Sequence, residues 1–165
     1  MTLRLGFVLG GIAALIAGTL RVAAAWQTGL QGLIEPELLY FIIDAGFLFG
    51  TVALYMRHAD ALGIAGLAGF VPALFGVALI LGPDVPLMGY DLYATGSTLF
   101  AAGMALLAAV SLFNRTEFGG AHFFLGAFAL GVAAQFVPGV PYHYEVAGTL
   151  FGLGFVMAGV QLVRG

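Results

Sequence analysis

The chain has 165 residues, of which 62% are hydrophobic and only 8% are charged, and its mean hydropathy is +1.09. A soluble domain carries about 25% charged residues, so this composition excludes a soluble protein and predicts an integral membrane protein. The sequence contains no cysteine and no lysine, which excludes disulfides, thiolate chemistry and a lysine Schiff base. The net charge of −3 is too small to indicate nucleic acid or another strongly charged partner.

Six apolar segments follow one another along the chain, each close to the ~20 residues that cross the hydrocarbon of a bilayer. In lipid these segments must be helices, because their backbone groups have no other hydrogen-bond partners. The predicted fold is all-α, a compact polytopic bundle of six transmembrane helices in one domain covering residues 1–165. The predicted spans are Leu5–Trp26, Leu38–Met56, Ala61–Leu81, Leu92–Phe113, Phe118–Val137 and Val146–Val163.

Four arginines set the orientation of this bundle. Arg4, Arg57, Arg115 and Arg164 all fall on one side of a six-span topology, and the positive-inside rule makes that side cytoplasmic. Both termini are therefore predicted to be cytoplasmic. The richness in small apolar residues and the use of arginine alone suggest a bacterial protein, so we expect the inner (plasma) membrane.

Three stretches of the sequence resemble one another, a pattern typical of an internal repeat. They are DAGFLFG from Asp44, TGSTLFAAG from Thr95 and EVAGTLFGLG from Glu145. Three copies of a helical hairpin of about fifty-odd residues would explain them, although low-complexity composition explains part of the similarity.

Small residues recur at a spacing of four along several predicted helices. This spacing lets helix backbones approach closely and predicts tight packing between helices in lipid. The residues concerned are Gly10, Ala14 and Gly18 in the first span, Gly46 and Gly50 in the second, and Gly148 and Gly152 in the sixth.

Two charges lie inside predicted spans at similar depth. Asp44 lies about 10 Å into the second span, and Arg21 lies near the outer end of the first. Since an isolated charge is costly in lipid, we expect the two side chains to form an ion pair in the outer leaflet. Tyr40, Gln135 and Glu145 lie toward the same side, so the sequence predicts a polar cluster in the outer half of the bundle.

Two interpretations of this cluster remain. In the first, the pair only fixes the register of two helices, and removing one partner costs about 3–5 kcal/mol. The alternative is a functional site, because intramembrane charges usually mark substrate or ion pathways.

Metal, cofactor and catalytic sites receive little support from the sequence. His143, Glu145 and Asp91 are weak candidates for a metal site on the outer face, without the usual ligand spacing. No cofactor is predicted, since His122 and His58 do not form a matched pair of haem ligands. The standard hydrolase, metalloprotease and phosphate-binding motifs do not occur.

The sequence therefore favours a non-enzymatic membrane protein, and it leaves three functions open. The first is a structural or accessory subunit that packs against other membrane proteins or against itself within the lipid bilayer. The second is a protein that binds or transports a small solute through an outward-facing pocket above Arg21 and Asp44. The third is a membrane enzyme or metal site on the outer face.

Overall fold

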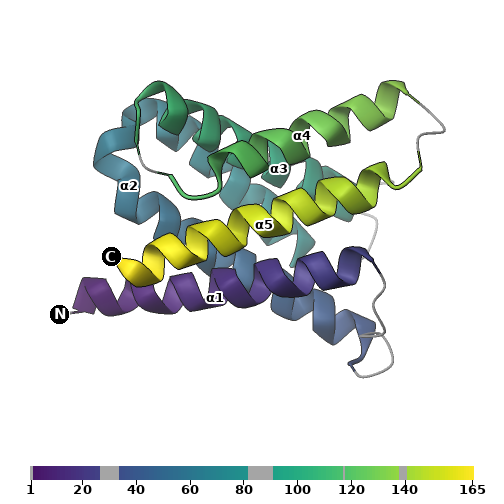
Figure 1. Ribbon diagram of the computed structural model, residues 1–165, viewed down its shortest axis with the longest axis horizontal. Helices are drawn as coiled ribbons and strands as arrows, with labels where there is room; N and C mark the ends of the chain where they lie inside the picture. The colour runs from purple at the N-terminus through teal and green to yellow at the C-terminus, as the bar shows by residue number, and fades with distance from the viewer. Residues whose placement is uncertain (1, 27–33, 82–90, 117, 138–140) are drawn as a thin grey trace.

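The computed structural model describes the chain except residues 1, 27–33, 82–90, 117 and 138–140, and the described residues form five α-helices without a β-strand (Figure 1). The predicted all-helical class is confirmed. The predicted number of six separate helices is not, because the second and third predicted spans form one element. The helices are α1 (Thr2–Ala25), α2 (Pro36–Ile80), α3 (Leu92–Phe113), α4 (Ala121–Phe136) and α5 (His143–Arg164).

Helix α2 reverses its direction at Gly63. This residue has φ 58° and ψ −153°, outside the helical range and in a region that only glycine adopts easily. Tyr55 and Phe70 stack with ring centroids 4.0 Å apart, whereas the same stretch of straight helix would separate them by about 22 Å. The second and third predicted spans are therefore two arms of α2, residues 36–62 and 64–80, joined at one residue.

Helix α4 is shorter than the span predicted for this part of the chain. It begins at Ala121 instead of Phe118, because Gly120 is in the left-handed conformation with φ 86° and starts the helix. Its 16 residues extend over about 24 Å. Phe118 is buried in front of the helix, with its ring centroid 5.8 Å from that of His58.

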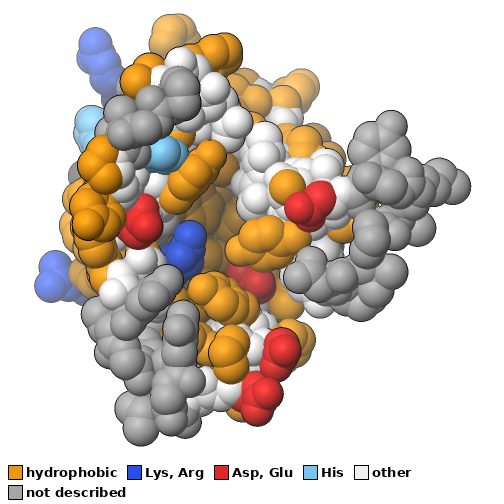
Figure 2. Space-filling model, turned by 90° about the vertical axis from the view of Figure 1, so that its right-hand side faces the viewer, with side chains coloured by type: hydrophobic (Ala, Val, Ile, Leu, Met, Phe, Trp, Pro, Cys, Tyr) orange, Lys and Arg blue, Asp and Glu red, His pale blue; other side chains and the backbone are white. Residues whose placement is uncertain are grey.

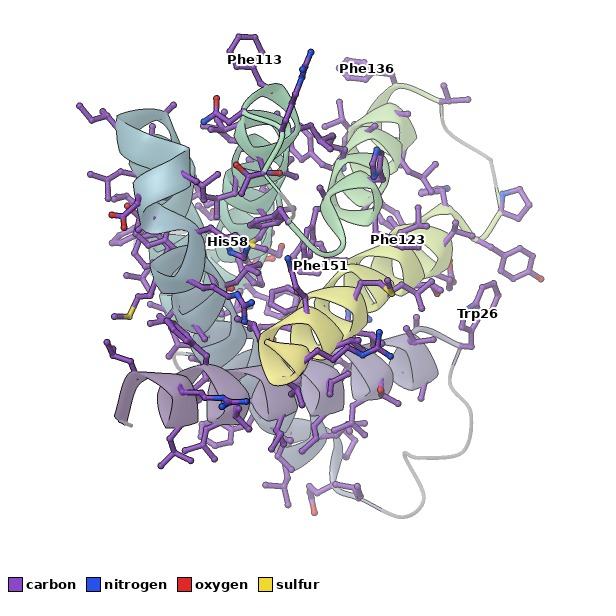
Figure 3. The ribbon with its side chains drawn as sticks, turned by 60° about the vertical axis from the view of Figure 1, so that its left-hand side comes forward. Trp26, His58, Phe113, Phe123, Phe136 and Phe151 are labelled. Carbon is purple, nitrogen blue, oxygen red and sulfur yellow. The ribbon has the colours of Figure 1, made fainter. Side chains whose placement is uncertain are left out.

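Helices α1, α2, α3 and α5 are long and apolar enough to cross a membrane. Large apolar side chains lie on the outside of the bundle, including a stripe of Leu5, Leu9, Ile12 and Ile16 along α1. Figure 3 shows Phe113 and Phe136 projecting away from the helices. Such a surface is unfavourable in water and ordinary in lipid, so the structure is compatible with an integral membrane protein.

Glycines bring α1 and α5 together backbone to backbone. A Cβ atom on Gly18 would lie 2.5 Å from the carbonyl oxygen of Gly152, and one on Gly152 would lie 2.7 Å from that of Gly18. Two turns along, a Cβ on Gly159 would lie 2.6 Å from the carbonyl oxygen of Gly11. We call these four glycines the α1–α5 seam; the two helices run antiparallel along it.

The first arm of α2 packs antiparallel against α1 in a similar way. A Cβ on Gly50 would lie 2.8 Å from the Cβ of Ala14, and Gly10 and Gly46 make comparably close contacts across the same interface. These are the small residues that the sequence marked for helix packing in the first two spans. They leave no room for larger side chains between the helices.

Both termini lie at the same end of the bundle (Figure 1). Hydrogen bonds join neighbouring helices and turns at this end. The side-chain oxygen of Gln161 on α5 accepts a hydrogen bond of 2.5 Å from the backbone N–H of Gly119, just before α4. Asn114, after α3, donates its amide to the carbonyl oxygen of Ala61 over 2.9 Å. We call this end the arginine end, since Arg4, Arg115 and Arg164 lie at or next to helix ends there and Arg57 lies six residues before the reversal of α2.

Candidate ligand-binding cavity

Three phenylalanines from three helices meet at the centre of the bundle. Phe47 lies on the first arm of α2, Phe100 on α3 and Phe151 on α5. The centroids of their rings are 5.7 Å apart for Phe47 and Phe100, 5.5 Å for Phe47 and Phe151, and 5.1 Å for Phe100 and Phe151. We call these residues the phenylalanine triad. Phe155 on α5 and Phe124 on α4, both nearer the arginine end, pack against these rings, with ring centroids 4.3 Å apart for Phe47 and Phe155 and 5.5 Å for Phe124 and Phe151.

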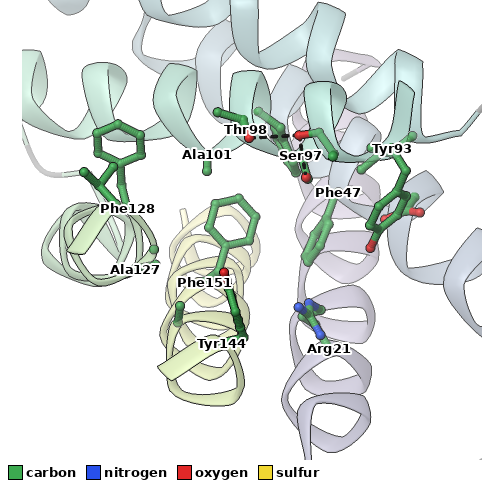
Figure 4. Close-up of a pocket in the computed structure, with 18 of the residues that line it drawn as sticks. Arg21, Phe47, Tyr93, Ser97, Thr98, Ala101, Ala127, Phe128, Tyr144 and Phe151 are labelled. Atoms are coloured by element: carbon green, nitrogen blue, oxygen red, sulfur yellow. Dashed lines mark hydrogen bonds between the residues drawn. The ribbon is translucent and has the colours of Figure 1, made fainter. Parts of the chain in front are cut away.

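An open cavity of about 690 Å³ lies on the other side of the triad, and all five helices contribute to its lining. Figure 2 looks onto this end of the molecule, where the surface is hollowed between hydrophobic side chains with charged side chains close by. Most of the lining is apolar, including Phe128 and Val132 on α4 and Ala101 on α3. Figure 4 shows the residues arranged around the space.

Arg21 and Asp44 both line this cavity. Asp44 precedes Phe47 by about one helical turn and is 8% exposed, while Arg21 is half-buried on α1. Within the residues that the structure describes, no direct hydrogen bond joins the two side chains. The two residues predicted to form an ion pair both line this cavity, and the ion pair itself stays a prediction.

The guanidinium of Arg21 packs closely against Gly148 of α5. A Cβ atom on Gly148 would lie 2.7 Å from Nη2 of Arg21, so a larger residue here would require the guanidinium to shift. Gly148 was predicted as a helix-packing residue, and in the structure it packs against this charged group. The position of the cation therefore depends on two helices, α1 and α5.

Hydroxyl and amide groups complete the polar lining. Ser97 and Thr98 on α3 both donate hydrogen bonds to the carbonyl oxygen of Ala94, over 3.1 Å and 2.8 Å (Figure 4). Gln135 on α4 lies 3.5 Å from the hydroxyl of Tyr144 on α5, with its amide as donor. Tyr93 on α3 also lines the cavity and is 44% exposed. Together these groups form a polar rim above the triad.

Two members of the predicted polar cluster do not line the cavity. Tyr40 is partly buried and packs against the apolar core. Glu145 lies half-buried in the first turn of α5, where its carbonyl oxygen accepts a hydrogen bond of 2.7 Å from Thr149. The structure therefore brings Arg21, Asp44 and Gln135 together around one space and leaves the other two outside its lining.

The weak metal candidates are not gathered into one site. Asp91 caps α3 by accepting a hydrogen bond of 2.9 Å from the backbone N–H of Ala94. The ring of His143 packs on that of Tyr144, with centroids 4.2 Å apart. Within the described ranges, no group of three or more histidine, cysteine, aspartate or glutamate residues is close enough to hold a metal ion.

Sequence reasoning missed the aromatic and hydroxyl residues of the cavity. The signal for them was the spacing of the triad, whose phenylalanines are 53 and 51 residues apart in the chain. Tyr93 and Tyr144 each precede a triad phenylalanine by seven residues, two helical turns on the same face. Tyr40 stands at the same distance before Phe47 and does not line the cavity, so this spacing alone would not have identified the lining tyrosines.

Comparisons with protein-family models, curated proteins and solved structures find no match to this chain. The functional argument consequently rests on the cavity itself.

Proposed function

We propose that this is a non-catalytic integral membrane protein that binds a small solute in a cavity open to the outer side of a bacterial inner membrane. The observation that carries the proposal is the position of Arg21 and Asp44, which both face the cavity and do not seal it by pairing directly. An intramembrane ionisable group usually faces a wet space or a ligand, because exposure to lipid is costly. A solute with complementary groups would stabilise both charges.

We further propose six membrane passes, two of them supplied by the arms of α2. The reversal at Gly63 supports this topology, since it returns the chain toward the side from which α2 began. The shorter α4 would supply the fifth pass. The gathering of four arginines at one end supports a cytoplasmic position for that end and for both termini. The cavity would then open toward the outer leaflet and the aqueous phase beyond it.

A threefold repeat of helical hairpins accords with this topology. The hairpins would be α1 with the first arm of α2, the second arm of α2 with α3, and α4 with α5. The convergence of Phe47, Phe100 and Phe151, one from the second helix of each hairpin, supports such a repeat. Repeats related in this way place ligand sites at their common interface, where this cavity lies.

Purification in mild detergent tests the proposed function. Bound small molecules are identified by mass spectrometry from the wild type and from the double variant Arg21→Gln/Asp44→Asn, which removes both charges without leaving one unpaired. We expect the wild type to retain a molecule that the double variant loses. Adding this molecule back at 100 times its Kd is expected to stabilise the wild type by about 2.7 kcal/mol.

The matched control is Arg164→Gln/Asp60→Asn, which removes one cation and one anion from exposed positions outside the cavity. It is expected to retain the molecule. Equal retention by the cavity double variant contradicts solute binding at this site. Migration of the wild type within a larger complex, without a bound molecule, favours instead the accessory subunit that the sequence suggested.

A further inference from the structure

The polar groups of the cavity divide into donors and acceptors. Arg21 offers only N–H donors. Asp44 offers acceptors, and the hydroxyl protons of Ser97 and Thr98 are already donated to the carbonyl oxygen of Ala94. These two hydroxyls can therefore present only lone pairs to a ligand. The cavity thus contains a cation for a negative group and a set of acceptors for a donor-bearing positive group.

A second feature is the passage between α3 and α4, whose contact is less extensive than those of the other chain-adjacent helices. Thr98 is exposed although it lines the cavity, and Val132 of α4 is 41% exposed at the same space. Ala101 of α3 and Phe128 of α4 add apolar groups to the same side of the lining (Figure 4). Exposed residues of α3 and α4 thus border the cavity, and an apolar chain that left it here would pass between these two helices.

We propose that the solute is an amphiphile with a zwitterionic head that carries a phosphate or carboxylate and a primary ammonium group, and with an acyl chain that leaves between α3 and α4. The anionic group would bind Arg21, and the ammonium group would donate hydrogen bonds to Asp44, Ser97 and Thr98. A primary ammonium fits better than a quaternary one because these acceptors require N–H donors. The inference rests on the proposed solute binding at this site.

The size of the cavity supports a ligand larger than the head alone. Its volume of about 690 Å³ lies within the ~300–1,000 Å³ typical of sites for drug-sized molecules. The charged groups occupy only part of the lining, and the remainder is apolar. An acyl chain would cover the apolar lining formed by the triad and by the residues between α3 and α4. A water-soluble zwitterion would leave this apolar surface uncovered.

Four probes test the head and the chain separately. The protein is reconstituted in nanodiscs of phosphatidylglycerol, and binding is measured by the shift of the thermal unfolding midpoint and by native mass spectrometry. Lysophosphatidylethanolamine is expected to bind at least about tenfold more tightly than lysophosphatidylglycerol or lysophosphatidylcholine, which lack the ammonium donors. Free phosphoethanolamine, which lacks the chain, is expected to bind at least about tenfold more weakly as well.

Two variants test the geometry. Ala101→Trp fills the passage and is expected to abolish the preference for the lysolipid over free phosphoethanolamine. Its control, Leu106→Trp, places the same ring on an exposed position of α3 outside the cavity. Gly148→Ala displaces the flexible end of Arg21 and is expected to weaken binding of the lysolipid about tenfold. In its control, Gly126→Ala, the new Cβ would meet only Leu150 at 3.5 Å.

The outcomes separate the two proposals. If free phosphoethanolamine binds as tightly as the lysolipid and Ala101→Trp changes nothing, the amphiphile is contradicted while solute binding stands. If lysophosphatidylglycerol binds as tightly as lysophosphatidylethanolamine, the ammonium contact is contradicted. If none of the probes binds, the inference is wrong, and the proposed function is then judged by the molecules that co-purify with the wild type.

Discussion

The α1–α5 seam and the contact between α3 and α4 use the same residue type to opposite effect. In the seam, Gly18 and Gly152 approach each other's carbonyl oxygens so closely that no side chain fits. On α4, Gly131 lines the cavity, and a Cβ atom there would meet nothing within 4 Å. In this bundle a glycine therefore either permits close contact with the facing helix or borders an open space, depending on whether a helix backbone lies opposite it.

The largest expected effect on stability comes from replacing a glycine of the α1–α5 seam by alanine. In Gly18→Ala the new Cβ must displace backbone atoms of α5, so we expect a loss of about 2 kcal/mol in the free energy of unfolding. Thermal unfolding in mild detergent measures it. The matched control on the same helix is Gly6→Ala, where the Cβ would meet nothing within 4 Å. Equal midpoints for the two variants would show that the seam does not hold the helices together.

A smaller loss is expected where α4 is attached to α5. Gln161→Leu removes the acceptor of the Gly119 N–H, and losing this hydrogen bond is expected to cost about 1 kcal/mol. Hydrogen exchange of the Gly119 amide would report the loosening directly. Gln161→Glu keeps an oxygen acceptor at the same place and serves as the control. Unchanged protection of that amide in the leucine variant would contradict the prediction.

The smallest expected effect has the opposite sign. Gly131→Ala adds a methyl group to open space and removes the conformational penalty of glycine in a helix, so we expect a gain of about 0.5 kcal/mol. The same unfolding measurement, set beside Gly18→Ala, compares one substitution in the two regions. A loss of stability in both variants would mean that α4 packs as tightly as the seam.

The all-helical class, the apolar segments and the shared position of Arg21 and Asp44 were accessible from the sequence. Hydropathy and helix length determine the first two, and the cost of burying a charge points to the third. Helix boundaries were less predictable. The polar run Arg57–Asp60 led to a predicted break between the second and third spans, but the chain stays helical through it and reverses only at Gly63.

The cavity itself could not be predicted. Periodicity places Ser97 and Thr98 on a helix face, but it does not say whether a neighbouring helix fills the space in front of them. That depends on the contact between α3 and α4, two helices separated by the turn at Gly120. Likewise, Gly148 followed the four-residue pattern of packing glycines, although it accommodates a guanidinium.

In the proposed six-pass topology, the reversal at Gly63 also bears on how the chain would enter the membrane during synthesis. The first arm of α2 carries Asp44, whose insertion at the centre of a bilayer costs about 2.5–3.5 kcal/mol, whereas residues 64–80 carry no charge. Because a single residue joins the arms, neither can partition into lipid far ahead of the other. In the proposed topology the two arms would therefore enter the membrane together, as a hairpin.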